Sequence, residues 1–477
     1  MPSVIENKRI KEKCQIFTPA QTVSEMLDMA GYNENLFGKK VLENSCGNGE
    51  VLIQIVQRYI NDCKKKRFSK TKIKIGLETD IVAYEIDDER INECINRLNI
   101  IAKEYKLEDV KWNINNLDFI KTQTEDNYNY IIGNPPYIAY PDLPQSVQTY
   151  LKNNFTTCKK GKFDYSYAFI EKSYNCLSNG GVLVYIIPSN IFKNVFANNL
   201  RELIKNDLQT IVDFPDKQVF DKVLVSPAII KVKKHSNENC VVYCNGTLKT
   251  KIDKKSLGNK WVFFRTNEQK GEKIGDYYKV SSTIATLLND AFVLKNTKYD
   301  DMYYYTDEHK IERELIRKAI SPKNKKYKKT DEYIIFPYYY DNDDKLCHYE
   351  PKDFEEQFPN ATKYLTTFNE KLKKRDSDKS AKWYEYGRSQ ALQHMKQRKI
   401  LISSVISDCT EAYLLESDEI PYSGLYIVQT GTKKLEDLLP ILNSLEFKEY
   451  IMSVGVCVSG TSKRITPSDI ANYVCDL

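Results

Sequence analysis

The chain has 477 residues, of which 41% are hydrophobic and 29% charged, a composition typical of a globular protein with two or three domains. A net charge of +6 permits a nucleic-acid partner without requiring one. The charged N-terminus and the lack of any apolar run near the roughly 18 residues of a membrane span predict a cytoplasmic protein without a membrane partner. Twelve scattered cysteines and four histidines show no convincing ligand spacing, so we expect no metal site.

From about residue 40 to 235, apolar runs typical of strands alternate with helical patterns. The first pair is "KKVLEN" and "VLIQIVQRYIND", and the last ends in "GVLVYIIPSN". This alternation predicts an α/β fold, a doubly wound and mostly parallel sheet covered by helices on both faces. The basic insertion "CKKKRFSKTKIKIGLETD" within it is expected to be a solvated loop.

The residue pattern and composition of the sequence change after about residue 238. Helical periodicity fades, and aromatic clusters such as "YIIFPYYYDNDD" and "KWYEYGR" appear. We therefore place a domain boundary there, dividing residues 1–238 from a mixed α+β domain of residues 239–477.

Small and acidic residues follow three successive predicted strands. Gly47 and Gly49 lie in "ENSCGNGEV", Glu85 in "YEIDD" and Asp118 in "NLDFI". Open α/β sheets bind ligands beyond the carboxyl ends of their strands, so these residues predict a nucleotide-like cofactor. NAD is the alternative cofactor; Leu52 in place of a third glycine, and the long separation between the glycines and the acid, count against it.

The stretch "YIIGNPPY" ends an apolar run at two prolines, which fix two φ angles and make the turn stiff. Asn134 and Tyr137 are therefore held in one geometry. A plain strand followed by a rigid turn would also explain the pattern.

These segments together resemble the gamma class of S-adenosylmethionine-dependent DNA methyltransferases, which make N6-methyladenine. The resemblance runs in order from residue 14 to about 235 and implies a seven-stranded methyltransferase sheet. It rests on eight motifs, found in "CQIFTPAQTVSEML", "VLENSCGNGEVL", "VAYEIDD", "NNLDFI", "NPPY", the pair in "GKFDYSYAFIEKSYNCLSNGGVLVYIIPSN", and "VDFPDKQVFDKVLVSPAIIKV".

The resemblance implies S-adenosylmethionine as the cofactor and assigns residues to it. Its implied binding residues are Thr18, Glu43, Ser45, Cys46, Gly47, Gly49, Glu85, Ile86, Asp118, Phe119 and Phe169. Glu85 would take the ribose and Asp118 the adenine amino group. An ordinary turn carboxylate would also explain Asp118, and a helix-face core position would also explain Phe169.

The same resemblance makes Asn134, Pro135, Pro136 and Tyr137 the catalytic motif. The Asn134 side-chain oxygen and the Pro135 carbonyl would accept the two N–H bonds of an adenine amine, and the transfer needs alignment rather than a histidine base. The target adenine must leave the duplex, and Tyr137 and Phe220 would stack on it. Phe220 could equally be a core phenylalanine.

The second half resembles target-recognition domains, which implies duplex DNA as the partner. Arg388, Lys463 and Arg464 are the expected DNA contacts, with a solvated charged face as the alternative for each. No nuclease pattern is found, so we expect a monomer that methylates without cutting, either alone or beside a restriction endonuclease encoded nearby. An RNA adenine methyltransferase and a catalytically silent DNA-binding module remain the alternative functions.

Overall fold

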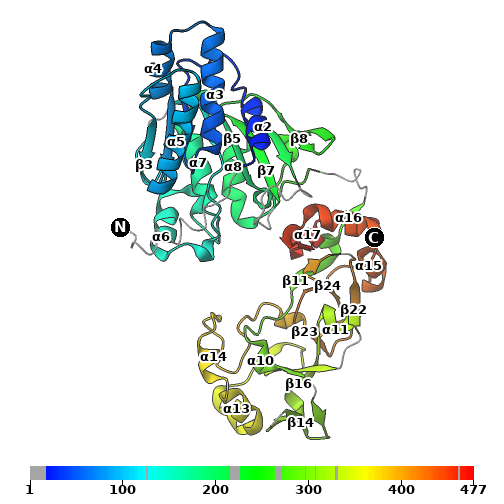
Figure 1. The fold of residues 1–477 in the computed structure, drawn as a ribbon. Coiled ribbons are helices and arrows are strands. Elements are labelled where there is room, and N and C mark those ends of the chain that lie inside the picture. Colours follow the sequence, from blue (N-terminus) through cyan, green and yellow to red (C-terminus); the bar gives the residue numbers. More distant parts are fainter. Residues whose placement is uncertain are drawn as a thin grey trace. The chain divides into compact units, whose positions relative to one another are not determined.

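The computed structural model describes residues 18–124, 127–214, 226–263, 271–295, 297–306, 308–327, 331–407, 409–459 and 462–477 (Figure 1). The chain forms two compact units that divide after Phe263, and each is described by itself. In the described ranges no helix combines the length and the apolar character needed to cross a bilayer.

The first unit is built on a nine-stranded sheet in the order β3-β2-β1-β4-β5-β7-β6-β8-β9. Its strands are β1 (Val41–Glu43), β2 (Ile81–Glu85), β3 (Asn113–Asn116), β4 (Tyr128–Gly133), β5 (Leu177–Pro188), β6 (Leu208–Asp213), β7 (Pro227–Lys233), β8 (Cys240–Asn245) and β9 (Leu248–Asp253). Strands β1 to β5 pair with one another in parallel, whereas β7 runs antiparallel between β5 and β6. The strand order reverses between β1 and β4, the position where open α/β sheets bind ligands.

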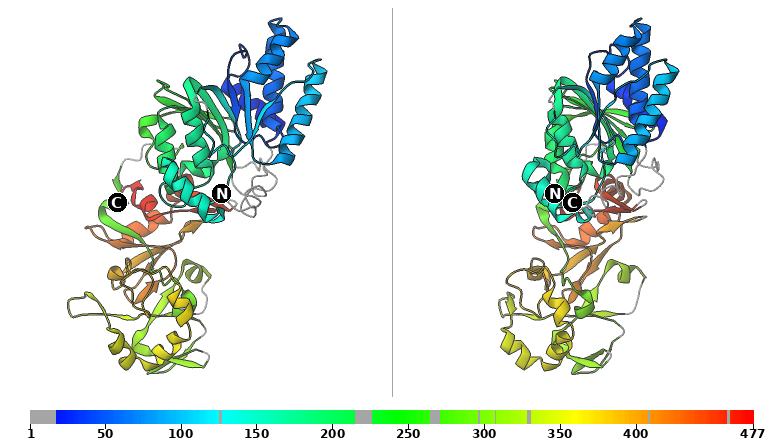
Figure 2. Two further views of the ribbon diagram at one scale, coloured as in Figure 1. Left: turned by 90° about the vertical axis from the view of Figure 1, so that its left-hand side faces the viewer. Right: turned by 60° about the vertical axis from the view of Figure 1, so that its left-hand side comes forward.

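Helices cover both faces of this sheet, as Figure 2 shows. The helices are α2 (Ala20–Ala30), α3 (Glu50–Lys65), α4 (Lys70–Asp80), α5 (Asp88–Glu104), α6 (Gln145–Asn154), α7 (Ser166–Cys176) and α8 (Asn198–Lys205). Buried side chains of α2 to α5 share one apolar cluster with the sheet, and those of α6 to α8 share another. The predicted doubly wound α/β fold is therefore confirmed.

The basic insertion at residues 63–80 is helical for most of its length rather than a loop. It contains the last turn of α3 and all of α4, whose N-cap Ser69 accepts a hydrogen bond from the amide of Lys72. Ile73 and Leu77 are buried against the sheet cluster. A few apolar side chains on one face are enough to fix an otherwise charged helix to the core.

The boundary between the units lies later than residue 238. Strands β8 and β9 form a hairpin around Gly246, which has a φ of 56°. Because β8 pairs in parallel with β6, the hairpin extends the seven predicted strands and belongs to the first unit. The turn between the strands is the residue pair Gly246 and Thr247, and a glycine at the first turn position is a hairpin signal because Gly adopts positive φ without strain.

The second unit is a mixed α+β structure of several small sheets. Its strands are β10 (Glu272–Lys273), β11 (Tyr278–Ser282), β12 (Val293–Lys295), β13 (Lys298–Tyr299), β14 (Tyr303–Thr306), β15 (His309–Glu312), β16 (Ile316–Ile320), β17 (Glu332–Ile335), β18 (Tyr338–Tyr340), β19 (Leu346–His348), β20 (Lys399–Ile402), β21 (Val405–Ile406), β22 (Ala412–Leu415), β23 (Glu419–Pro421), β24 (Leu425–Gln429), β25 (Val456–Ser459), β26 (Ser462–Arg464) and β27 (Val474–Cys475). Its helices are α9 (Ile274–Tyr277), α10 (Asn289–Phe292), α11 (Pro322–Tyr327), α12 (Pro351–Gln357), α13 (Pro359–Thr366), α14 (Asn369–Lys373), α15 (Leu435–Leu442), α16 (Leu445–Val454) and α17 (Pro467–Ala471).

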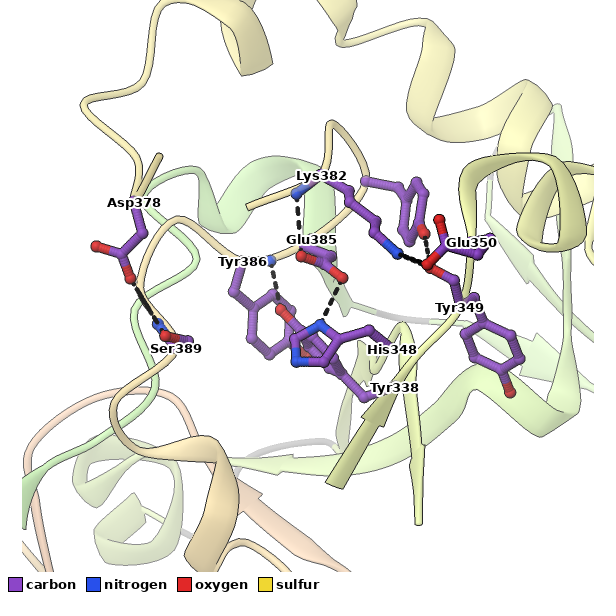
Figure 3. Close-up of polar contacts among 10 residues, drawn as sticks. Tyr338, His348, Tyr349, Glu350, Asp378, Lys382, Glu385, Tyr386 and Ser389 are labelled. Carbon is purple, nitrogen blue, oxygen red and sulfur yellow. Dashed lines mark hydrogen bonds and ion pairs between the residues drawn. The ribbon is translucent and has the colours of Figure 1, made fainter. Parts of the chain in front are cut away.

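Many of the clustered aromatic residues form the core of this second unit. Tyr338, Tyr384 and Tyr386 are at most 2% exposed. Figure 3 shows polar contacts between residues of this core. The amide of Tyr386 donates a hydrogen bond to the Tyr338 hydroxyl, and the buried Glu385 carboxylate contacts His348 at 2.7 Å. These buried aromatics serve packing and are not a surface that could meet DNA.

Candidate functional site

A pocket lies in the first unit where the loops after β1, β2, β3 and β4 meet α7. Twelve of the residues singled out from the sequence line it: Thr18, Glu43, Ser45, Cys46, Gly47, Glu85, Ile86, Asp118, Phe119, Asn134, Pro136 and Phe169. The strand ends thus bring together motifs that are more than a hundred residues apart in the chain. Pro135, Tyr137 and Gly49 lie beside this lining, and Phe220 falls outside the described residues.

Asn134 is held on three sides at the end of β4. Its side-chain NH2 donates to the Thr18 hydroxyl at 3.2 Å, and its side-chain oxygen accepts a hydrogen bond from the Tyr137 hydroxyl. The Ser45 hydroxyl donates to its main-chain oxygen at 3.0 Å. The contacts with Thr18 and Tyr137 fix which side of the side-chain amide carries the oxygen, and an amide oxygen can accept more than one hydrogen bond.

Tyr137 acts in this structure as a clamp on Asn134. Its single hydroxyl proton is shared between two acceptors, the Asn134 side-chain oxygen and the carbonyl oxygen of Ile186 on β5, while its ring packs against the core cluster beneath α2 to α5. Burial raises the pKa of Tyr137 well above its ordinary value, so the hydroxyl remains a protonated donor at neutral pH. The expected stacking of this ring on a base remains a prediction.

Glu85 joins the loops that follow β1 and β2. One carboxylate oxygen accepts the amide of Gly47 at 2.9 Å, and the other accepts the amides of Ile86 and Asp87 at 2.8 and 3.0 Å. Three main-chain donors bound to one ionised acceptor fix this part of the pocket. The carboxylate still lines the pocket, where a ribose hydroxyl could donate to it.

Glu43 is a buried carboxyl group with an unused oxygen. Its side chain is 3% exposed, and its Oε2 has no hydrogen-bond partner among the described residues. Burial, together with the nearby Cys94 and Glu85 side chains, raises the pKa of Glu43 well above its ordinary value. A buried orphan acceptor that lines a pocket fits a cationic ligand group, because the missing partner is a positive charge or a donor.

Aromatic residues form the other end of the pocket. The rings of Phe119 and Phe169 lie with centroids 5.8 Å apart, and Tyr165 meets Phe169 edge-on at 5.3 Å. Phe169 is 5% exposed and belongs to the core, so the same side chain packs on a helix face and lines the pocket. Flat, apolar walls of this kind suit a purine ring.

Asp118 lies beside these rings and also has the structural role of a turn carboxylate. Its side chain accepts the amide of Ile120 at 3.0 Å and pairs with Lys121 at 3.2 Å. Because it lines the pocket as well, both interpretations of this residue agree with the structure.

The two glycines of the first loop differ in their surroundings. A Cβ on Gly47 would meet no protein atom within 4 Å and would project into open space at the pocket wall. A Cβ on Gly49 would lie 2.6 Å from the Cys94 sulfur, and Gly49 is the N-cap of α3 with a φ of 92°. Gly47 therefore leaves room for a ligand, whereas Gly49 allows the helix to start and pack.

Sequence reasoning missed several residues that line the pocket. They are Asn44, Asn48, Glu50, Val51, Asp87, Arg90, Leu117 and Tyr165. Most of them are immediate neighbours of motif residues, and that adjacency is the signal that could have found them.

Two of the three expected DNA contacts in the second unit already interact with side chains of the same unit. Arg388 pairs with Asp376 at 3.1 Å and with Asp378 at 3.0 Å, so its charge is already compensated. Lys463 and Arg464 are consecutive residues of β26, and the Lys463 ammonium lies 3.3 Å from the Cys457 sulfur. All three remain predicted contacts.

Comparison with known proteins shows what the first unit is similar to. Residues 36–220 match the Eco57I restriction-modification methylase family. Type II restriction enzyme and methyltransferase RM.Eco57I of Escherichia coli is 27% identical over 366 residues, which are 66% of this chain and 35% of that protein. Type II methyltransferase M.HincII of Haemophilus influenzae is 29% identical over 258 residues, which are 53% of this chain and 44% of that protein.

Among solved structures, the type IIL restriction-modification enzyme MmeI in complex with DNA has a similar fold. The match has a TM-score of 0.59 at 13% identity and covers 98% of this chain and 67% of that chain. The chain spans less than half the length of the curated relatives named above.

The resemblance to restriction-modification methyltransferases is therefore confirmed, as is the α/β sheet with a C-terminal mixed unit. S-adenosylmethionine, the expected cofactor, agrees with the match to a methylase family and with the pocket: an orphan carboxyl group suits its cationic end and the aromatic wall suits its adenine.

Proposed function

We propose that this protein is a site-specific DNA methyltransferase that transfers a methyl group from S-adenosylmethionine to N6 of an adenine rotated out of the duplex. The observation that carries the proposal is the fixed amide of Asn134 at the pocket wall, held by Thr18, Tyr137 and Ser45.

An exocyclic adenine amine is a weak nucleophile because its lone pair is delocalised into the ring. Two neutral acceptors on its N–H bonds favour the form in which the lone pair is available. The Asn134 side-chain oxygen supplies one acceptor, and the Pro135 carbonyl, stiffened by the paired prolines, supplies the other. Neither group removes a proton before the transfer, so no histidine base is required.

The pocket residues would hold the cofactor in a single orientation. Glu43, with Thr18, Ser45 and Cys46, would surround the methionine end, Glu85 would accept the ribose hydroxyls, and the adenine would pack against Ile86, Phe119 and Phe169 near Asp118. When bound, S-adenosylmethionine supplies a sulfonium-activated methyl group. The task of the chain is then to align the amine with that methyl and to exclude water.

The DNA partner is supported by the relatives rather than by a surface of this chain. The relatives are named restriction and modification enzymes, and the MmeI structure is a complex with DNA. By the same reasoning the second unit would be the target-recognition domain. The whole protein would act as a monomer, and a separate endonuclease would cut unmodified DNA.

Transfer of labelled methyl groups tests the proposal. The purified protein is incubated with S-adenosylmethionine carrying a tritiated methyl group and with either duplex DNA or RNA. We expect label in duplex DNA only, and none with Asn134→Ala, which should still bind S-adenosylhomocysteine. Label in RNA alone would favour the RNA methyltransferase; no label in either would support the silent binding module.

A further inference from the structure

Lys172, on α7, is directed at the backbone of the loop that follows β3. Its ammonium donates hydrogen bonds to the carbonyl oxygens of Phe119 and Thr122, and to that of Ile120 at 3.3 Å. It also lies 4.8 Å from the centre of the Phe119 ring. One side chain thus contacts the main chain of a whole turn and the face of one of its rings.

This turn carries two of the residues at the adenine end of the pocket. The amides of Lys121 and Thr122 both donate to the carbonyl of Asp118, which closes residues 118–122 into a single helical turn. Such a turn leaves its last carbonyls without main-chain partners, and they converge at its end. An ammonium with three donors matches three converging carbonyls and suits the negative end of the turn.

The carboxylate of Asp118 is held by contacts with other residues of the same turn. It accepts the amide of Ile120 and pairs with Lys121. The carboxylate is therefore fixed to the turn, and Lys172 joins the turn to α7 through three carbonyl oxygens. Because α7 also supplies Phe169, the same helix places both ring walls of the pocket.

We propose that Lys172 is a positioning residue that sets the distance and orientation of Asp118 and Phe119 toward the adenine of the cofactor, and so sets the selectivity for its 6-amino group. This inference rests on the proposed function, because it takes S-adenosylmethionine as the ligand. Lys172 contacts the turn but does not line the pocket, so it would act on the cofactor only through the turn.

Calorimetric titration with two ligands tests the inference without any turnover. The ligands are S-adenosylhomocysteine and S-inosylhomocysteine, which carries an oxo group in place of the 6-amino group. With the unsubstituted protein we expect tighter binding of the adenosyl compound. Lys172→Met should bind it about tenfold more weakly, because three carbonyls lose their donor, and should bring the two affinities close together.

Lys152 provides a matched control on α6. Its ammonium lies 4.8 Å from the centre of the Tyr140 ring and 2.6 Å from the Tyr140 hydroxyl, and neither residue lines the pocket. Lys152→Met removes a comparable half-buried lysine and should leave both affinities unchanged. Lys172→Arg, which keeps a cation and several donors, should restore part of the preference for the adenosyl compound even if Lys172→Met folds poorly.

The outcomes separate this inference from the proposed function. If the unsubstituted protein binds neither ligand, the assignment of the cofactor fails. If it prefers the adenosyl ligand and both Lys172 variants keep that preference in full, Lys172 does not position the turn and the inference is overturned.

Discussion

The phenol of Tyr137 donates its hydrogen bond to the side-chain oxygen of Asn134, three residues earlier in the same turn. The Asn134 amide is bonded at its other end to Thr18. The Asn-Pro-Pro-Tyr turn therefore has two functions: the prolines restrict its backbone, and the tyrosine restricts the side chain that faces the pocket. Preorganised acceptors of this kind lower an activation barrier because they need no rearrangement during the reaction.

Replacing Tyr137 by phenylalanine separates the hydroxyl clamp from the aromatic ring. Tyr137→Phe should lower kcat about tenfold, because one hydrogen bond that holds Asn134 is lost, while the KM for DNA changes little. Tyr137→Ala should raise the KM as well if the ring stacks on a base. Steady-state methylation of a defined duplex measures both constants; an unchanged kcat in Tyr137→Phe would show that the clamp has no catalytic effect.

The two glycines after β1 should respond differently to alanine. Gly49→Ala should lower the free energy of unfolding by about 1–3 kcal/mol, since its Cβ meets buried Cys94 and its φ is unfavourable for alanine. Gly47 also has a positive φ, 52°, but Gly47→Ala should cost less stability because no protein atom obstructs its Cβ, and it should weaken binding of S-adenosylhomocysteine. Urea denaturation and calorimetry test the pair, and equal losses of stability would contradict the different roles.

Asp164 provides a pH test beside the catalytic turn. Its main chain bridges to Ala139, and its carboxylate accepts the Ser166 amide and hydroxyl at 2.9 and 2.7 Å. Burial raises the pKa of Asp164 to about 6, although both hydrogen bonds act to lower it. The unfolded value is about 3.9, so the favourable contribution of the protonated form is complete below that pH and is lost as the pH rises through about 6.

Asp164→Asn should remove this pH dependence. Its amide oxygen can still accept both hydrogen bonds from Ser166, which go to a single oxygen in the structure. The free energy of unfolding of the unsubstituted protein should fall more steeply from pH 4.5 to 7 than that of the variant. Denaturation curves at several pH values measure the two slopes, and parallel slopes would show that Asp164 titrates normally.

The sequence predicted the parallel sheet well because its strands are buried on both faces and read as continuous apolar runs. Helix α4 was missed because charged residues, threonines and Ile75 are mixed on its exposed side, and Ile73 and Leu77 are its only large apolar side chains that are buried. The hairpin of β8 and β9 was assigned to the second domain because an edge pair, with β9 largely exposed, lacks a strong apolar signal.

The lining of the pocket was predictable because strand ends at a change of strand order converge whatever their separation in the chain. The contacts of Lys172 and the double role of Tyr137 could not be predicted, because the sequence around a lysine on a helix or a tyrosine in a turn does not indicate which residues they contact. In the second unit, sequence clustering indicated aromatic residues correctly but could not tell which of them, such as Tyr338 and Tyr386, form the core.

The central claim is that Asn134 converts an adenine amine in DNA into a methyl acceptor. Mass spectrometry of nucleosides tests it most directly, using duplex DNA treated with the purified protein and S-adenosylmethionine and then digested. The account predicts N6-methyldeoxyadenosine with the unsubstituted protein and none with Asn134→Ala. Absence of methylated adenine in both samples, or equal amounts of it in both, would contradict it.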